Sequence, residues 1–330
     1  VSYGESISSE ERLDYGPLVY IMSVLFQVIF GRAKIAMILE NLLWFGLLLY
    51  STYSIAKKLP GKKAGIWCIM ILAFLPVMSG MTRVYLLELA LAAMVTSAIM
   101  MLLSLDTKSL RSSMAFAAVF SLGMLTKLNF IFFLVVPVST VLIYQFRRHG
   151  KKVLKNMVVM VLVIVIVVSP WYLMKGQQEG SNIIKESEEV KEVLSTGDRF
   201  KGWMLDLESY DDIFLHIFQV IGSQLNIIIF AFFIIGLSVM CYKDIRTWVI
   251  IAWIATPHII ISIILATSIH VDTRYLVPSI PGYVILAVIG IYRSSMNRYI
   301  KKVMIALMIA MIGYNFMFVS YDIDAFGIYE

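Results

Sequence analysis

The sequence predicts an all-α, multi-pass membrane protein. Its 330 residues are 60% hydrophobic with a mean hydropathy of +0.84, whereas about half of the residues in a soluble domain are apolar. Apolar runs recur along the chain, and most approach the ~20 residues that a helix needs to cross a bilayer. Charged residues collect in the segments between these runs. We therefore expect a bundle of about ten transmembrane helices, with further helices along its outer surface.

The first element is a short apolar run at 17–30, preceded by the polar and acidic residues 1–14. At about 14 residues it is too short to span, so we predict a helix lying along the outer interface. Pro17 suits the first turn of that helix, where its missing N–H costs nothing. Residues 1–34 then form one outer segment. The chain starts at Val1, without a basic segment ahead of an apolar one, and we interpret it as lacking its natural N-terminus.

Two blocks of transmembrane helices are expected at 35–173 and 213–320, separated by an outer acidic loop at 174–212 and followed by an outer tail at 321–330. The predicted spans are 35–56, 64–81, 84–105, 114–126, 130–146, 153–173, 213–242, 248–269, 275–292 and 303–320. Within the acidic loop, residues 183–194 have the pattern of a short amphipathic helix. We interpret the loop as a solvated outer face, with a lid over a site as the alternative.

The orientation follows from lysine and arginine, which favour cytoplasmic loops. One set of alternate loops holds more than half of the 28 lysines and arginines, but only Asp106 and Asp244 of the 22 acids. These loops are 57–63, 105–113, 147–155, 243–246 and 293–302. We predict that they are cytoplasmic and that the turns at 82–83, 127–129 and 270–274 face outside, in the cell membrane. The net charge of +6 arises from lysines and arginines in these loops, where the orientation of a membrane protein explains them. We therefore expect no nucleic-acid partner.

The predicted outer turns carry ionisable residues, which are functional candidates wherever they lie at or below the membrane interface. Arg83 and Glu88 flank the start of one span, Lys127 lies in a tight turn, and Arg274 and Tyr275 open another span. Each has a structural alternative. Arg83 and Glu88 would simply pair at a helix end, Lys127 would be an interfacial anchor, and Arg274 with Tyr275 would belong to an ordinary interfacial belt.

Several other kinds of site are not supported by the sequence. Two cysteines, Cys68 and Cys241, do not make a disulfide framework. The four histidines are far apart and lack paired acids at metal-ligand spacing. No Gly-rich phosphate loop is present. We therefore predict no metal and no cofactor.

Six short motifs follow one another in an order that resembles a known family. They are Tyr15-Gly16-Pro17-Leu18-Val19-Tyr20, Phe30-Gly31, Thr82-Arg83 with Glu88 downstream, Leu125-Thr126-Lys127, Ser169-Pro170-Trp171-Tyr172, and Arg274-Tyr275 with Pro278. This order is similar to that of the GT-C membrane glycosyltransferases. The nearest branch holds the dolichyl-phosphate-mannose–protein mannosyltransferases and the bacterial aminoarabinose transferase of lipid A. The resemblance runs from about Asp14 to about Pro281.

The resemblance implies an enzyme that moves a single sugar from a polyprenyl-phosphate carrier to a protein, lipid or glycan acceptor on the outer face, with inversion. It also implies roles for residues. Glu88 matches the family's second acidic position, and donor-phosphate binding falls to Arg83, Lys127, Arg274, Tyr275 and Tyr15. The family's general base is the aspartate of an Asp-Glu pair, which this chain lacks before Tyr15, and Gly16 stands where the family often has proline. Asp14 and Glu5 are the substitutes that we consider among the carboxylates before Tyr15, and neither matches the motif well, so we take Glu88 and Asp14 as the catalytic candidates.

The residue types suit this chemistry on physical grounds as well. Cations at the interface would stabilise charge growing on the leaving phosphate, and a carboxylate beyond the sugar would take the acceptor's proton. The main alternative is a transporter or lipid flippase, which would place coupling charges near the bilayer midplane, often with internal repeats. We find no repeat, and apart from Glu40 and His258 the charges cluster at one interface. A non-catalytic scaffold would leave the outer cations unexplained.

Overall fold

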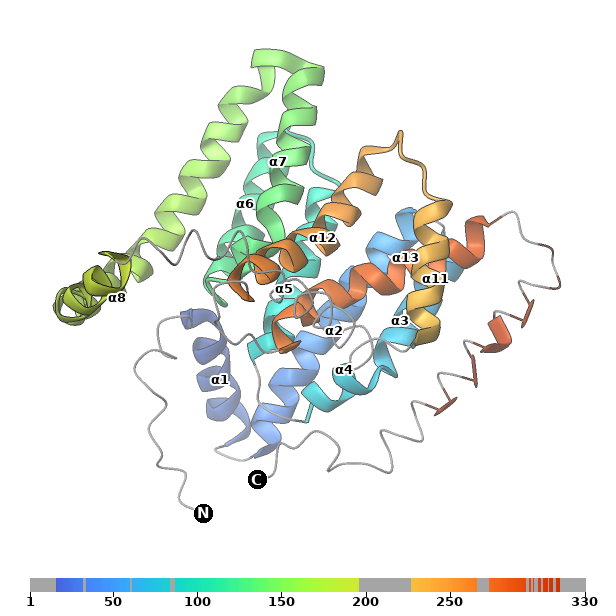
Figure 1. The fold of residues 1–330 in the computed structure, drawn as a ribbon, viewed down its shortest axis with the longest axis horizontal. Helices are drawn as coiled ribbons and strands as arrows, with labels where there is room; N and C mark the ends of the chain where they lie inside the picture. The colour runs from blue at the N-terminus through green and yellow to red at the C-terminus, as the bar shows by residue number, and fades with distance from the viewer. Residues whose placement is uncertain are drawn as a thin grey trace.

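The fold is taken from a computed structural model (Figure 1). It describes residues 16–31, 34–59, 61–83, 87–195, 227–265, 273–294, 297, 299, 302–303, 305–307, 309–310 and 313–314, with backbone only for 176–195, 261–265 and 273–274. Every regular element in this part of the chain is a helix, which confirms the predicted all-α class. Helix α5 (Leu87–Leu102) lies at the centre of the bundle, with nearly all of its side chains buried.

The N-terminal helices follow local sequence signals closely. Helix α1 (Pro17–Phe30) has the bounds of the predicted run, since Pro17 occupies its first position and Gly31 ends it with a φ of 81°. Helix α2 (Lys34–Lys58) is 25 residues long and packs against α1, α3 and α5. Seven large apolar side chains of α1 are exposed, as expected of a helix that contacts lipid: Tyr20, Ile21, Val24, Leu25, Val28, Ile29 and Phe30.

The predicted span at 64–81 is not a single helix. Helix α3 (Lys62–Ala73) ends at Phe74, and the short helix α4 (Pro76–Met81) starts anew. Pro76 has no N–H to continue the ladder, and it holds the preceding Leu75 in an extended conformation with a ψ of 127°. The break redirects the chain just before the turn that carries Arg83.

A second difference concerns the acidic segment. Helix α6 (Leu110–Met124) and helix α7 (Phe130–His149) are followed by the 3-10 turn η1 (Gly150–Val153) and by α8 (Leu154–Ser195). Helix α8 continues for 42 residues through Pro170, so the span predicted to end at 173 has no break there. Lysine, glutamine and glutamate are good helix formers, and a change from apolar to polar residues does not by itself end a helix.

The C-terminal half adds helix α11 (Ile227–Ser238), helix α12 (Ile245–Leu265), the 3-10 helix η2 (Thr273–Ser279) and helix α13 (Ile280–Arg293). The predicted span 275–292 therefore begins as a 3-10 helix rather than an α-helix. Helices α11 and α13 pack closely because glycines face each other. A Cβ added to Gly236 would lie 2.0 Å from the Leu286 carbonyl oxygen. The first part of the run at 213–242 lies outside the described residues.

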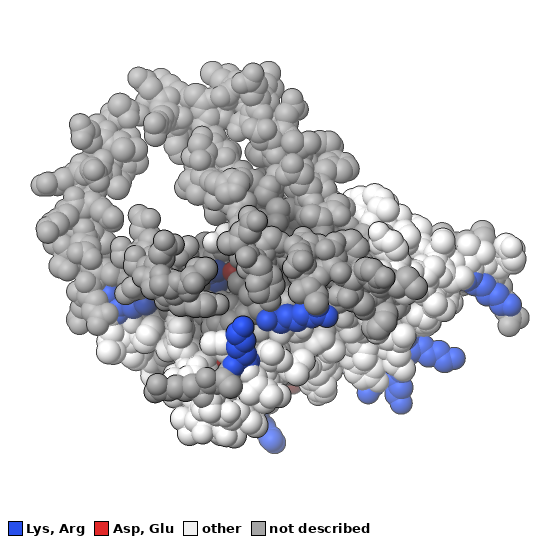
Figure 2. Space-filling model, turned by 90° about the horizontal axis from the view of Figure 1, so that it is seen from below, with Lys and Arg blue, Asp and Glu red and all other residues white. Residues whose placement is uncertain are grey.

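The protein is an integral membrane protein. Three helical stretches are long and apolar enough to span: Lys34–Lys58, Phe130–Lys175, which includes the turn between α7 and α8, and Tyr275–Arg293. Shorter apolar helices accompany them. On the face seen in Figure 2, the visible charged side chains are almost all basic. Of the four acidic side chains described, Glu40 and Glu88 are buried or nearly so.

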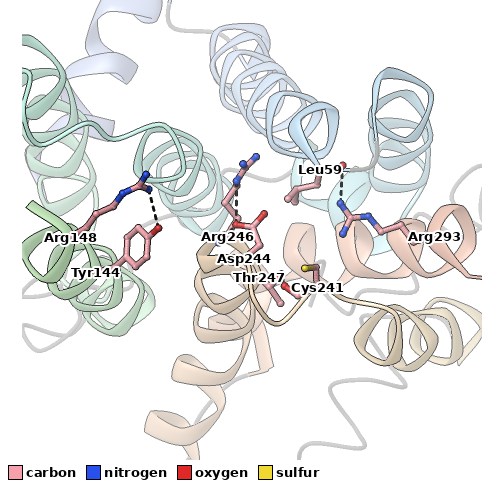
Figure 3. A network of polar contacts seen from close by, with 8 residues as sticks. All are labelled: Leu59, Tyr144, Arg148, Cys241, Asp244, Arg246, Thr247 and Arg293. Carbon is pink, nitrogen blue, oxygen red and sulfur yellow. Dashed lines mark hydrogen bonds and ion pairs between the residues drawn. The ribbon is translucent and has the colours of Figure 1, made fainter.

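The basic loops meet at one end of the bundle. Arg293 donates to the Leu59 carbonyl (3.1 Å), Gln145 to that of Leu105 (3.1 Å) and Asn156 to that of Thr107 (2.8 Å). Figure 3 shows this end, with Arg246 paired to Asp244 and Arg293 reaching Leu59. These contacts link the loops that were predicted to share the cytoplasmic side.

Candidate active site

The opposite end of the bundle is organised around the turn between α6 and α7. Thr126 Oγ1 donates to the Leu122 carbonyl (2.9 Å), and Phe130 N donates to the Lys127 carbonyl (3.0 Å), so hydrogen bonds within the segment hold the turn. Lys127 lies in this turn and is 2% exposed; it is the only lysine or arginine buried in the described part of the chain. Removing an ammonium group from water costs several kcal/mol unless partners compensate it.

Glu88 and Tyr275 are partners of the Lys127 charge among the described residues. Its Nζ lies 3.4 Å from Glu88 Oε1, with side-chain exposures of 3% and 12%. The same Nζ lies 4.9 Å from the centroid of the Tyr275 ring, a distance at which the ring face attracts a cation. Glu88 sits in the first turn of α5, where the helix dipole favours an acid. Residues far apart in sequence thus meet at one buried cation.

Hydrogen bonds from α12 and within η2 itself hold η2, the 3-10 helix that carries Tyr275. Trp253 Nε1 of α12 donates to the Pro278 carbonyl (3.1 Å), and Ser279 Oγ donates to the Leu276 carbonyl (2.6 Å). Both bonds satisfy carbonyls of η2 that a short 3-10 helix leaves open. The position of the Tyr275 ring over Lys127 is therefore set by α12 and η2 together.

Helix α1 docks its N-terminus onto the Lys127 turn. Gly16 N donates to the Thr126 carbonyl (3.2 Å) and Leu18 N to the Leu125 carbonyl (3.0 Å), while Pro17 between them has no N–H to satisfy. Only glycine fits at position 16, because a Cβ there would lie 2.0 Å from the Leu125 carbonyl oxygen. This contact explains why Gly16 precedes Pro17 in the first motif.

Two further motifs reach the same region. Tyr172 Oη of α8 donates to the Met124 carbonyl (2.7 Å), which ties the Ser-Pro-Trp-Tyr motif to the end of α6. Asn41 Nδ2 of α2 lies 3.4 Å from the carbonyl oxygens of both Met81 and Thr82. The Asn41 contacts hold the turn that presents Arg83.

The structure separates the expected site residues into three groups. Glu88, Lys127 and Tyr275 are in contact. Arg83 lies exposed in the turn after α4. Asp14, Tyr15 and the Arg274 side chain lie outside the described residues, although Gly16 and Tyr275 adjoin them in sequence. No group of three His, Cys, Asp or Glu side chains that could hold a metal occurs among the described residues.

The structural alternative for Arg83 and Glu88 is wrong. Among the described side chains, the ion pair of Glu88 is with Lys127 and not with Arg83. Sequence reasoning missed this pair because the partners are 39 residues apart and lie in different turns. It also missed the partners of Glu40, whose carboxylate accepts hydrogen bonds from Ser23 of α1 and Trp44 of α2.

Fold and site together define an all-α integral membrane protein with a cluster of ionisable side chains at one end of its bundle. Residues 14–173 match the family model for dolichyl-phosphate-mannose-protein mannosyltransferases. The structure is similar to that of ArnT from Cupriavidus metallidurans bound to undecaprenyl phosphate, with a TM-score of 0.65 and 18% identity over 91% of this chain and 54% of that one. For ArnT in the apo state the TM-score is 0.60, with 18% identity over 91% and 53% of the two chains.

These matches confirm the expected resemblance to the GT-C mannosyltransferases and aminoarabinose transferases. The chain spans about half the length of the ArnT chains that it matches. Comparison with curated proteins gives no match.

Proposed function

We propose that this chain is a membrane glycosyltransferase. It moves a single sugar from a polyprenyl-phosphate carrier to an acceptor on the extracytoplasmic face, with inversion at the sugar carbon. The observation that carries the proposal is the buried Lys127, held between Glu88 and Tyr275 where the family-like motifs converge. A fold shared with a protein crystallised with undecaprenyl phosphate supports the choice of donor.

In this proposal Lys127 binds the donor phosphate. The bond between sugar and phosphate breaks during transfer, so negative charge grows on the phosphate oxygens. A cation fixed in a site with little water stabilises that charge more than an exposed cation does. Arg274 precedes Tyr275 in sequence and adds a fork that suits a phosphate. Arg83 and Tyr15 complete the proposed donor-phosphate set.

The acceptor's proton needs a carboxylate on the face of the sugar away from the phosphate. Glu88 already contacts the cation that holds the phosphate. We therefore assign it first to orienting Lys127, with proton acceptance as its second candidate role. Asp14 is the other candidate base, because it lies two residues before the docked Gly16.

Contacts inside the bundle favour an enzyme over the transporter alternative. His258 of α12 bonds to Tyr283 of α13, and Glu40 bonds to Ser23 and Trp44. The ionisable groups within the spans therefore have fixed protein partners, which coupling groups in a transport cycle would need to exchange. Lys127 and Tyr275 also contact each other, which supports one shared site at the outer end.

The test is equilibrium binding of undecaprenyl phosphate to the purified chain in lipid nanodiscs. Replacing Lys127 by Gln should weaken binding at least ~10-fold, the size of one charge-assisted contact. Lys175→Gln is the matched control, because Lys175 lies over the Trp171 ring rather than beside Glu88. Equal binding by wild type and Lys127→Gln in folded protein would refute the phosphate site.

A further inference from the structure

The buried acid Glu40 has no role in the proposed transfer, yet it is fully buried in α2. Its carboxylate accepts a hydrogen bond from Ser23 Oγ of α1 (2.6 Å) and another from Trp44 Nε1 (3.2 Å). None of the described lysines and arginines forms an ion pair with it. A well-packed apolar residue would fill this position at lower cost. The two hydrogen bonds therefore call for an explanation beyond packing.

The Ser23 bond lies on the one buried face of α1. Val19 and Ser23 are the only buried side chains of α1, and they lie one turn apart on the face toward α2. The rest of the helix presents exposed apolar side chains. Apolar contacts allow a helix to slide along its neighbour and to rotate about its own axis. A short hydrogen bond to a carboxylate holds the donor side chain in one direction and so restricts that rotation. The Ser23–Glu40 bond thus sets the rotation of α1 against α2.

The N-terminus of α1 contacts the Lys127 turn. Gly16 and Leu18 donate to the carbonyls of Thr126 and Leu125, immediately before Lys127. From Ser23 back to Gly16 the helix rises about 10 Å. The first half of helix α1 is therefore a short rigid link, bonded to α2 at Ser23 in the middle of the helix and to the Lys127 turn at its N-terminus.

We infer that Glu40 and Ser23 are positioning residues for the donor-phosphate site and that they act through α1. This inference rests on the proposed function. The Ser23–Glu40 bond fixes α1, α1 fixes the carbonyls of Leu125 and Thr126, and these carbonyls fix the depth of the Lys127 ammonium. Neither residue contacts the donor. Their loss displaces Lys127 rather than removing a ligand.

The experiment compares three variants of the full chain in nanodiscs. Ser23→Ala removes the donor of the bond. Glu40→Gln keeps one acceptor oxygen but replaces the other by an NH2 group, which cannot accept the hydrogen bond from Ser23 or from Trp44. Ser51→Ala is the matched control, because it removes an equally buried bond of α2, to Ser97 (2.9 Å), that does not involve α1. The measurements are undecaprenyl phosphate binding and hydrogen exchange at the Gly16 and Leu18 amides.

Ser23→Ala should weaken undecaprenyl phosphate binding roughly 5- to 30-fold, and Glu40→Gln by less, as expected for loss of one charge-assisted hydrogen bond. Both variants should exchange faster at Gly16 and Leu18. Ser51→Ala should change neither measurement. Binding by Ser23→Ala at the wild-type level, or an equal loss in Ser51→Ala, would overturn the inference. If the wild type itself does not bind, the proposed function fails, whereas unchanged exchange in Ser23→Ala refutes the link through α1 separately.

Discussion

Replacing Glu88 by Gln neutralises the partner of the buried Lys127 and leaves the side chain nearly the same size. At 3.4 Å the pair attracts by about 5 kcal/mol with an effective dielectric constant near 20. The net contribution is smaller, because both groups lose water on burial. A donor phosphate that binds Lys127 must compete with this carboxylate. Removing the carboxylate charge should therefore strengthen phosphate binding.

We expect undecaprenyl phosphate to bind Glu88→Gln about 10- to 100-fold more tightly than wild type. This change corresponds to roughly 1.4–2.8 kcal/mol of binding free energy, gained because the phosphate no longer competes with a carboxylate for Lys127. Turnover should fall, because Lys127 loses the group that orients it and the site loses a carboxylate. The assay is equilibrium binding in nanodiscs, with single-turnover sugar transfer measured on the same preparation.

Asp106→Asn serves as the matched control. Asp106 is an exposed acid in the basic end of the bundle, where its Oδ1 accepts from Lys108 N (3.0 Å). Its neutralisation should leave binding unchanged. Folded Glu88→Gln that binds the phosphate no more tightly than wild type would refute the competition. If the variant does not fold, the Lys127–Glu88 pair is structural.

Three further outcomes are expected. Cysteines introduced at Ser2 and Ser181 should both react with an impermeant reagent added outside, and labelling of only one would contradict the predicted topology. Gly16→Ala should destabilise the protein by about 1–3 kcal/mol and weaken phosphate binding, because a Cβ overlaps the turn carbonyl; Gly46→Ala, with open space at its Cβ, is the thermal-melting control. Arg274→Lys should bind the lipid phosphate better than Arg274→Gln but worse than wild type, since an ammonium cannot make the bidentate contact. Equal binding by all three would exclude Arg274 from the site.

Features that depend on neighbouring residues, such as the bounds of α1, could be predicted from the sequence. The short apolar run was predicted as a helix with Pro17 in its first turn and its end at Phe30, and the structure confirms both. The predicted alternation of basic and acidic loops agrees with contacts that join the basic loops at one end. The break at Pro76 was also available locally, but the apolar run across it was continuous enough to be taken as one helix.

Long-range pairing was beyond sequence reasoning. Arg83 is the nearest cation to Glu88 along the chain, yet Lys127 is its partner, because the start of α5 and the turn between α6 and α7 lie together at the end of the bundle away from the basic loops. A hydropathy pattern shows which turns share a side but not which turns are neighbours. The contacts of Gly16 with the Leu125–Thr126 backbone were equally invisible, although glycine before proline was a departure from the family pattern.

The Lys127–Glu88 pair has a consequence for lipid selectivity. In the proposed function the site lies at headgroup depth, where every anionic phospholipid of the membrane carries a phosphate, and these lipids greatly outnumber any polyprenyl carrier. A bare buried lysine would hold one of them permanently. With Glu88 already on Lys127, an ordinary headgroup gains little by exchanging places with the carboxylate. In the proposed function, only a ligand that adds contacts through its sugar or its isoprenoid chain makes the exchange favourable, so Glu88 screens out the common lipids around the site.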